Sequence, residues 1–333
     1  MEILAGLPRD QAKLDLSIII VNWNSSGYLE KCLKSIVDHT SGPSFEIIVV
    51  DNASYDGCDR VANQYSGVVT LIQSESNLGF AKANNLGYHH STGDVLLFLN
   101  PDTEISFDAL QKMYRTFISL CDAGGLGCKV LNSDGTIQTS CIQAFPTITN
   151  QLLDAEFLRR LFPKLRFWGM RPLFETSDSP VEVEVVAGSC LMVHRAAFEK
   201  AGFFSEEYFM YGEDLDLCYK LRGCGYRNYY TGGASIVHHG GGSTKSTGKR
   251  SFSSVLMRDS VEKFLRKSKG NLYSRIFVFS LQLASLARII LLLILYPAAL
   301  LKLLDKMALE KGLAKWKNIF LWSIGRGGWV RNY

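Results

Sequence analysis

Apolar and polar positions in the first 130 residues alternate between two patterns. Continuous apolar runs predict strands buried on both faces, and between them apolar residues recur every three to four positions, as on an amphipathic helix. Buried strands separated by helices indicate an α/β fold with a mostly parallel sheet covered on both faces. The predicted strands are 16–22, 45–51, 68–72 and 95–99, and the predicted helices are 25–37, one beginning near Asp56, 80–90 and one beginning near Phe107.

The second half of the chain is less regular. Residues 131–181 carry four prolines and predict a variable segment with one helix near 148–160. Beyond it the apolar pattern returns, and no internal repeat is present. The further predictions are a strand over 181–195, a helix over 213–224 and a strand over 226–237.

One buried strand ends in a way that suggests a ligand site. The stretch DVLLFLNPDTEI contains the apolar run Val95–Leu99, which stops at Asn100-Pro101-Asp102. Proline lacks the N–H that a ladder needs, so it ends the strand. In open α/β sheets ligands bind at the carboxyl ends of the strands. The alternative is that Asp102 only caps the helix beginning near Phe107.

A second carboxylate ends the strand in IIVVDNAS. Asp51 suits hydrogen bonds from a base or ribose, and its alternative role is formation of the turn with Asn52. A Gly-rich phosphate loop does not follow the first strand, where the sequence is VNWNSSGYLEKCL. A phosphate-bearing ligand would therefore need another partner for its charge, most simply a metal ion.

Three acids open the helix in FMYGEDLDLCYKL. Glu213, Asp214 and Asp216 lie in its first turn, where the helix dipole lowers carboxyl pKa values. The aromatic and apolar residues 208–211 exclude water, and this desolvation raises carboxyl pKa values. A carboxylate between these influences suits a general base, although only one of the three need be catalytic and all can be structural.

The stretch VHHGGGST follows an apolar strand. His238 or His239 suits a metal ion, and the glycines allow close approach of a diphosphate. The basic segment STKSTGKR comes next, and its Lys245, Lys249 and Arg250 are placed to cover phosphate. The alternatives are a turn histidine and a solvated or lipid-facing loop.

Taken together, these motifs resemble family 2 glycosyltransferases of the inverting type with the GT-A fold, and most of all the rhamnosyltransferase-like branch that builds bacterial surface polysaccharides. The resemblance covers roughly residues 15–245 and is carried by SIIIVNWNSSGYLEKCLKSI, VVDNASYDG, NLGFAKANNLG, FLNPDTEI, AAFEKAGFFSEEYFMYGEDLDLCYKLRGCGY and VHHGGGST.

The resemblance implies roles for individual residues. Asp214, with Glu213 beside it, matches the motif of the general base. Asp102 matches the last Asp of the family's D-x-D motif and is expected to hold Mg²⁺ or Mn²⁺ together with His238, with His239 as the alternative. Asn100 replaces the first Asp of that motif, so one carboxylate fewer is available. The implied donor-binding residues are Asn22, Asp51, Asn77, Lys82, Asn100 and Asp102, with Asp216 and Lys245 as further candidates.

The resemblance also implies a reaction. A sugar would pass with inversion from a nucleoside-diphosphate-sugar, best matched by dTDP-L-rhamnose, to a saccharide or lipid-linked acceptor. UDP-galactose, UDP-GlcNAc and UDP-galactofuranose are alternative donors. A non-catalytic, membrane-anchored sugar-nucleotide-binding subunit is the alternative from another class, supported only by the missing first Asp.

Charge divides the chain into an acidic body and a basic tail. Residues 1–239 hold 19 basic and 28 acidic residues, a net charge of −9, whereas residues 240–333 hold 17 and 4, a net charge of +13. The tail encloses an apolar run, 276–301, so anionic lipid is a better partner for it than nucleic acid. We therefore predict a catalytic domain over 1–250 and a helical, membrane-associating segment over 251–333.

The apolar run is interrupted by Arg288 and Pro297. An unbroken helix of its length reaches roughly 39 Å, enough to span a bilayer. A span would, however, export the basic residues 302–333, against the positive-inside tendency. Helices in the membrane interface, or a re-entrant pair, are therefore favoured over a span, and a buried helix or an oligomer contact is the remaining alternative.

The N-terminus and the cysteines indicate a cytoplasmic protein on the inner face of the cell membrane. The first sixteen residues lack the apolar region of a signal peptide. The eight cysteines form no C-x-x-C pair, which favours scattered reduced thiols over disulfides or a zinc site. A homo-oligomer remains open.

Overall fold

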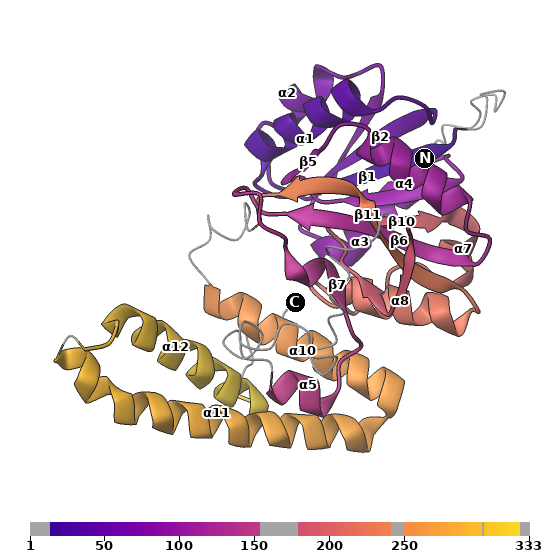
Figure 1. The fold of residues 1–333 in the computed structure, drawn as a ribbon. Coiled ribbons are helices and arrows are strands. Elements are labelled where there is room, and N and C mark those ends of the chain that lie inside the picture. Colours follow the sequence, from indigo (N-terminus) through magenta and orange to yellow (C-terminus); the bar gives the residue numbers. More distant parts are fainter. Residues whose placement is uncertain (1–13, 154–178, 241–249, 302, 327–333) are drawn as a thin grey trace, which may run out of the picture.

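A mixed sheet forms the centre of the molecule in the computed structural model, which describes residues 14–153, 179–240, 250–301 and 303–326 (Figure 1). Its nine strands lie in the order β3-β2-β1-β4-β10-β6-β11-β5, with β8 paired to β11, and β7 and β9 form a separate pair. The strands are β1 Leu16–Asn22, β2 Phe45–Asp51, β3 Val69–Gln73, β4 Val95–Leu99, β5 Thr103–Ile105, β6 Ala123–Leu131, β7 Ile142–Gln143, β8 Val181–Val183, β9 Val185–Val186, β10 Cys190–His194 and β11 Arg227–His238.

Helices cover both faces of this sheet, and three more form a layer to one side of it (Figure 1). The helices around the sheet are α1 Ser26–His39, α2 Cys58–Asn63, α3 Gly79–His89, α4 Ala109–Ile118, α7 Arg195–Lys200 and α8 Glu213–Gly223. The C-terminal layer consists of α10 Arg250–Lys269, α11 Asn271–Leu300 and α12 Lys306–Ser323, with the short α5 Ile148–Leu152 against α11.

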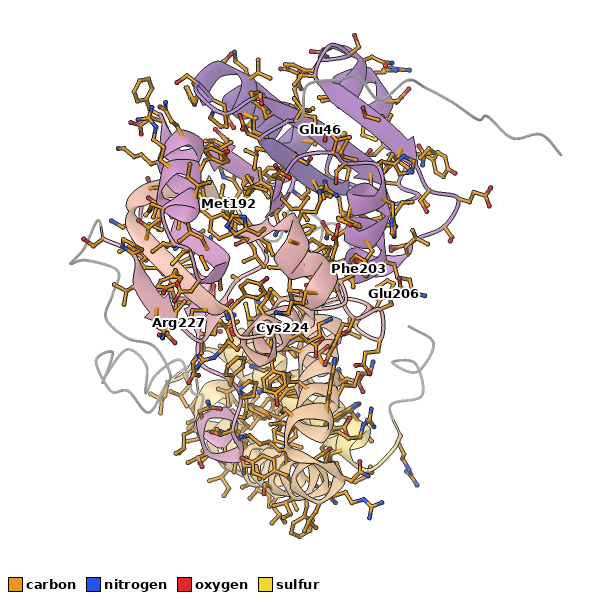
Figure 2. The ribbon with its side chains drawn as sticks, turned by 90° about the vertical axis from the view of Figure 1, so that its right-hand side faces the viewer. Glu46, Met192, Phe203, Glu206, Cys224 and Arg227 are labelled. Atoms are coloured by element: carbon orange, nitrogen blue, oxygen red, sulfur yellow. The ribbon has the colours of Figure 1, made fainter. Side chains whose placement is uncertain are left out.

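The predicted parallel sheet is confirmed for the first half of the chain. Strands β3, β2, β1 and β4 pair in parallel, and every residue of β1 and β4 is buried. On the other side of β4 the sheet becomes mixed, because β10 runs antiparallel to both β4 and β6. Figure 2 shows Met192 of β10 inside the molecule, whereas Glu46 and Arg227 lie near the starts of β2 and β11.

Some elements differ from the sequence-based expectations. The strand predicted over 181–195 is three short strands, because β8 pairs with β11, β9 with β7 and β10 with β4 and β6. The sequence did not predict β5 or β6, and β6 (AGGLGCKVL) is rich in glycine, which weakens a strand signal. The helix predicted over 148–160 starts at Ile148 and ends at Leu152, and its remaining residues from 154 lie outside the described residues.

The C-terminal layer is packed onto the sheet domain through α10. Phe264 of α10 is buried, with its ring 5.4 Å from that of Tyr219 in α8. Helix α12 returns alongside α11, and Trp322 donates to Asp259 of α10 at 3.0 Å. The domain boundary at residue 250 stays a prediction, since α10 begins at Arg250 and its apolar face joins the core of the sheet domain.

Candidate active site

The ends of four strands bring most of the predicted residues to one edge of the sheet. Asn22 and Asp51 are the last residues of β1 and β2 and pair in register. Strand β4, on the other side of β1, ends at Leu99, just before Asn100. Strand β11 ends at His238, beside β5. Because β1, β2 and β4 are parallel, their carboxyl ends form one polar edge, where α/β sheets bind ligands.

Asp51 lies in a dense hydrogen-bonded group. Asn22 Nδ2 donates to Asp51 Oδ1 at 3.2 Å, the Tyr55 N–H donates to Oδ2 at 3.3 Å, and Ser54 donates through its N–H and its hydroxyl. Burial raises the pKa of Asp51, but the hydrogen bonds, led by Ser54 and Gln73, hold it below its ordinary value. Asp51 therefore stays ionised and forms the turn that was its alternative role, and contact with a base remains a prediction.

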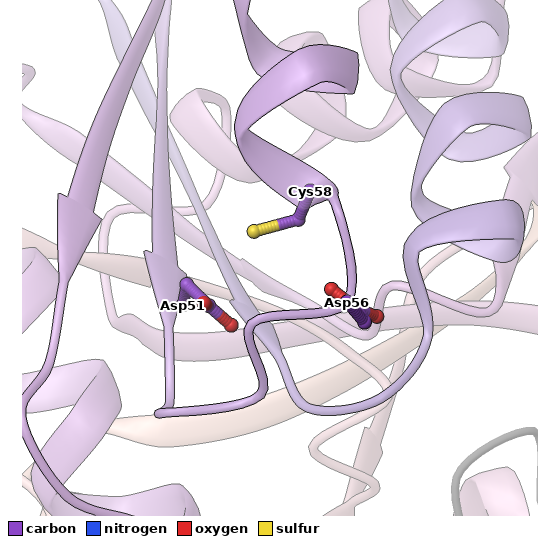
Figure 3. A group of neighbouring side chains, drawn as sticks. All are labelled: Asp51, Asp56 and Cys58. Atoms are coloured by element: carbon purple, nitrogen blue, oxygen red, sulfur yellow. The ribbon is translucent and has the colours of Figure 1, made fainter.

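Asp51, Asp56 and Cys58 place three potential metal-ligand atoms within 4.8 Å of one another (Figure 3). Their bonding argues against a metal centre, because Asp56 Oδ2 accepts the Ser26 N–H at 2.7 Å and Asp56 Oδ1 accepts Asn22 Nδ2 at 3.1 Å. Burial and the two nearby carboxylates raise the pKa of Cys58 to about 12, which disfavours the thiolate that a metal requires. The group is better suited to accepting hydrogen bonds from a ligand.

The loops after β1 and β2 contain strained backbone. Asn24, Ala53 and Tyr55 have positive φ angles of 51°, 60° and 51°, a backbone conformation that residues other than glycine rarely adopt. Such strain is concentrated at functional sites in proteins. Tyr55 is also 70% exposed, so its ring is accessible to a ligand at this edge. Sequence reasoning did not single out Tyr55 or Asp56, although both lie in the quoted motif VVDNASYDG.

Asn77 and Lys82 lie at the start of α3. Asn77 Oδ1 accepts the Gly79 N–H and Asn52 Nδ2, both at 2.9 Å, so this side chain ties α3 to the loop after Asp51. Lys82 is exposed and forms an ion pair with Glu206 at 3.8 Å. Asn77 thus belongs to the framework of the Asp51 loop. Lys82 instead contacts the segment between α7 and α8, which contains Phe203 and Glu206, both labelled in Figure 2.

Asp102 and His238 face each other across the edge of the sheet. His238 Nε2 lies 3.1 Å from Asp102 Oδ1 and 3.4 Å from Asn100 Nδ2, and both ring and carboxylate are largely buried. Asp102 does not cap α4, because β5 intervenes and α4 starts only at Ala109. The alternative role of Asp102 as a helix cap is therefore wrong.

The spacing of this pair fits a divalent cation. Two ligands at right angles around an ion with bonds of about 2.1 Å, as for Mg²⁺, lie about 3.0 Å apart. The observed 3.1 Å between Asp102 Oδ1 and His238 Nε2 is compatible with that value, and it is also the length of an ordinary imidazole–carboxylate hydrogen bond. Imidazole and carboxylate are also ligands that Mn²⁺ accepts. Asn100, in place of a second carboxylate, offers one neutral oxygen.

His239 is held away from this pair. Its Nε2 lies 2.7 Å from Glu104 Oε1 and its Nδ1 lies 2.7 Å from Ser133 Oγ, so both ring nitrogens have partners. The geometry favours His238 over His239 as the metal ligand. Lys245, a further candidate from the sequence, lies outside the described residues.

Asp214 and Glu213 differ in how their carboxyl groups are held. Asp214 Oδ2 accepts the Gly188 N–H and Oδ1 accepts the Leu215 N–H, both at 2.8 Å. Burial raises the Asp214 pKa although both N–H groups lower it. Glu213 is 6% exposed and its Oε2 has no hydrogen-bond partner among the described residues. Burial, and then the charge of Asp214, raise the Glu213 pKa to about 8, so Glu213 holds a proton at neutral pH.

Asp216 lies in an ion-pair network. It is fully buried and lies 2.7 Å from Lys267 Nζ of α10 and 3.4 Å from Lys220 Nζ, and Ser205 Oγ donates to it at 2.5 Å. Asp216 Oδ2 thus has hydrogen-bond and ion-pair partners, whereas Oδ1 has the ion pair with Lys267 and no hydrogen bond among the described residues. Asp216 therefore connects α8 to the C-terminal layer, which favours a structural role.

Comparison with known proteins agrees with this geometry. A sequence model of glycosyl transferase family 2 matches residues 17–201. N-acetylglucosaminyl-diphospho-decaprenol L-rhamnosyltransferase of Mycobacterium tuberculosis is 30% identical over 250 residues, covering 69% of this chain and 77% of the relative. Rhamnosyltransferase WbbL of Escherichia coli K12 is 26% identical over 231 residues, covering 67% and 82%.

Solved structures share the fold. The mannosyltransferase PcManGT of Pyrobaculum calidifontis, in complex with GDP-Man and Mn²⁺, has a TM-score of 0.59 at 16% identity and covers 97% of this chain and 91% of its own. GalNAc-T7, crystallised with UDP, GalNAc and Mn²⁺, has a TM-score of 0.52 at 18% identity over 69% and 44% of the two chains. The predicted GT-A fold class is confirmed.

Proposed function

The chain belongs to glycosyl transferase family 2, in its rhamnosyltransferase-like branch, and we propose that it is an inverting, metal-dependent enzyme. In this proposal it moves a sugar from a nucleoside-diphosphate-sugar to a saccharide or lipid-linked acceptor. The observation that carries the proposal is the pair Asp102–His238, spaced at 3.1 Å like two ligands of one cation. A metal ion bound there would neutralise the charge that develops on the departing diphosphate.

The chain's own residues supply the remaining steps. Asp214 accepts the proton of the attacking acceptor hydroxyl, because its carboxylate is held by two N–H groups and its raised pKa makes it a stronger base than an exposed aspartate. Glu213 keeps its proton at neutral pH and therefore limits the negative charge beside Asp214. Asp51 and Asp56 offer carboxylate oxygens to the donor's base and ribose, and the fully buried Asn22 holds both carboxylates through its amide nitrogen.

We take dTDP-L-rhamnose as the donor because two relatives are rhamnosyltransferases, and this chain aligns with 77% and 82% of their lengths. A UDP-sugar remains the alternative, since the Asp51 group would accept the N–H of uracil as well as that of thymine. A role in bacterial cell-surface polysaccharide synthesis follows from the same relatives.

A lipid-linked acceptor agrees with the C-terminal layer. Among the described residues one helix, over Asn271–Ala298, is long and apolar enough to cross a membrane. Arg288, which interrupts the apolar run, is engaged by protein: its guanidinium donates to the Leu152 carbonyl at 2.7 Å and lies 4.4 Å from the centre of the Trp316 ring. Exposed apolar side chains therefore continue along α11, at Leu283, Leu286, Ile290, Leu291, Leu293 and Ile294.

The position of α12 favours a helical hairpin lying in the membrane interface. Because α12 packs along α11, a spanning α11 would take the lysines of α12 into the bilayer, where each costs about 2.5–3.5 kcal/mol. On the surface of an anionic membrane the same lysines meet lipid headgroups while α11 contacts the acyl boundary. These lysines are Lys306, Lys311, Lys315 and Lys317.

Donor turnover tests the catalytic proposal. Full-length protein in mild detergent with Mn²⁺ would be screened against dTDP-rhamnose and a panel of UDP- and GDP-sugars, with and without a bacterial lipid extract, by release of nucleoside diphosphate. We expect turnover of dTDP-rhamnose, lowered at least about 10²-fold in Asp214→Asn and strongly in Asp102→Asn. Donor binding without turnover, even with lipid extract, would instead support the non-catalytic subunit.

Vesicle flotation tests the membrane proposal. Wild-type protein should float with phosphatidylglycerol vesicles and less with phosphatidylcholine vesicles, and high salt should reduce flotation with phosphatidylglycerol. The double variant Ile290→Glu/Ile294→Glu should stay at the bottom of the gradient, whereas Val37→Glu, an exposed apolar residue of α1, should float like wild type. Flotation that is independent of lipid charge, salt and the α11 variant would contradict an interfacial hairpin.

A further inference from the structure

Gln138 contacts His238 with both ends of its side-chain amide. Its Nε2 lies 2.6 Å from the His238 carbonyl oxygen, and its Oε1 lies 2.9 Å from His238 Nδ1. The two residues are 100 positions apart in the chain. Nothing in the sequence pattern around Gln138 indicates this contact, which arises from the pairing of β6 with β11.

The first of these bonds fixes the direction of the amide. A backbone carbonyl can only accept, so the group facing the His238 oxygen has to be the NH₂ of Gln138. The amide oxygen then necessarily faces Nδ1, and because that oxygen can only accept, Nδ1 has to carry the proton. The Gln138 side chain therefore favours the proton on Nδ1 of His238. Asp102 Oδ1, which lies 3.1 Å from Nε2 and also can only accept, favours the proton on Nε2 in metal-free protein, so Gln138 acts against that preference.

The consequence reaches the other ring nitrogen. With the proton on Nδ1, a neutral ring has its lone pair on Nε2, which is the atom 3.1 Å from Asp102 Oδ1. Metal-binding histidines commonly donate their second ring N–H to an oxygen, which fixes the tautomer and the orientation of the ring. Gln138 provides that oxygen here.

The backbone of Gln138 is itself held in place. Its N–H donates to the Val130 carbonyl at the end of β6 at 2.8 Å, and its carbonyl accepts the Cys141 N–H at 3.2 Å. Leu131 and Ile137 form a bridge just before it. A side chain projecting from a fixed backbone keeps the imidazole orientation with little loss of entropy.

We propose that Gln138 is a positioning residue that holds His238 in its Nδ1–H tautomer and so presents Nε2 to the divalent cation. This inference rests on the proposed metal role of His238. It assigns no contact between Gln138 and the substrate or the metal, because Gln138 acts only through the imidazole.

The tautomer is measured directly in metal-free protein. Full-length chain labelled with ¹⁵N-histidine, at a pH where the ring is neutral, would give the protonation of each ring nitrogen by long-range ¹H–¹⁵N correlation, with His238→Ala to assign the signal. We expect Nδ1–H in wild type and loss of that state in Gln138→Leu. An unchanged Nδ1–H signal in Gln138→Leu would overturn the proposal.

Mn²⁺ titration followed by electron paramagnetic resonance adds the metal. Removing such an orienting residue typically weakens metal binding about 10- to 100-fold, so Gln138→Leu should bind Mn²⁺ correspondingly less tightly than wild type. Gln143→Leu, the same change at an exposed glutamine five residues on, should match wild type. If His238→Ala binds Mn²⁺ as tightly as wild type, the proposed metal site is wrong, whatever the tautomer. If His238→Ala weakens binding and Gln138→Leu does not, only the role of Gln138 is wrong.

Discussion

Replacing Glu213 by glutamine should make the protein less sensitive to pH. The Glu213 carboxyl is 6% exposed, and one of its oxygens has no partner among the described residues. Its pKa is raised from 4.5 to about 8 by burial and by the charge of Asp214. Glutamine has nearly the same shape and stays neutral at every pH, so Glu213→Gln removes the titration and little else.

The sign of the effect follows from proton binding. Below pH 4.5 the carboxyl is protonated in both the folded and the unfolded chain, so it adds no pH dependence. Between about pH 4.5 and pH 8 the folded chain keeps a proton that the unfolded chain loses, so the free energy of unfolding falls as pH rises. At about 1.4 kcal/mol per pKa unit, the free energy of unfolding falls by at most about 5 kcal/mol across this pH range.

Urea unfolding of wild type and Glu213→Gln, followed by tryptophan fluorescence at half-unit steps from pH 5 to pH 8.5, measures this difference. The two curves should separate progressively with pH, the variant becoming relatively more stable. If burial of the glutamine NH₂ lowers the free energy of unfolding, it does so equally at every pH, so the dependence on pH is unchanged. Glu75→Gln, at an exposed glutamate, should run parallel to wild type. Parallel curves for Glu213→Gln as well would refute the claim that Glu213 is protonated at neutral pH.

Three further variants test other parts of the site. Asp216→Asn should lower the free energy of unfolding by about 1–3 kcal/mol, because it leaves the largely buried Lys220 ammonium without its carboxylate. Gly79→Ala should lower the melting temperature, since a Cβ there would lie 2.5 Å from the Phe209 carbonyl oxygen at a φ of +78°. Asp51→Asn should weaken nucleoside-diphosphate binding in calorimetry by about ten- to a hundredfold, from the loss of about 1.5–3 kcal/mol per charged hydrogen bond.

Each of these variants has a matched control. Asp38→Asn breaks an exposed ion pair and should change stability by about 1 kcal/mol or less, in contrast to Asp216→Asn. Gly135→Ala, at a φ of +80° with no atom within 4 Å, isolates the backbone cost from the steric clash at Gly79. Asp59→Asn, on the exposed side of α2, should leave nucleotide binding intact. Equal effects in variant and control would contradict the reasoning in each case.

The parts of the fold that the sequence predicted are those with strong local signals. Strand β4 was found because five apolar residues end at Asn100-Pro101, and the strand indeed stops there. Strand β6 was missed because its glycines give no β signal, and only pairing with β10 and β11 makes it a strand. The strand predicted over 181–195 has the right residue types, but its three parts pair with different partners, which the apolar pattern does not reveal.

The same limit applies to the site. The sequence placed three acids in one helical turn, and their separate roles depend on distant partners. The Gly188 N–H holds Asp214, and Lys267 holds Asp216. Likewise His238 and His239 are equivalent in the sequence VHHGGGST, and only the pairing of β11 with β5 directs one to Asp102 and the other to Glu104. Local pattern identified the right segments, and tertiary contacts distinguish the residues within them.

The ion pair between Lys267 and Asp216 has a mechanical consequence. It joins α10, which carries the apolar hairpin, to the helix that carries Asp214, and the rings of Phe264 and Tyr219 meet between the same two helices, so we expect membrane attachment to constrain the position of the proposed catalytic carboxylate. With the hairpin lying on lipid as proposed, the fold would hold Asp214 at a fixed distance from the membrane surface. Only an acceptor whose hydroxyl stands at that height would react efficiently. Transfer rates across lipid-linked acceptors of increasing saccharide length should peak at one length and flatten in detergent.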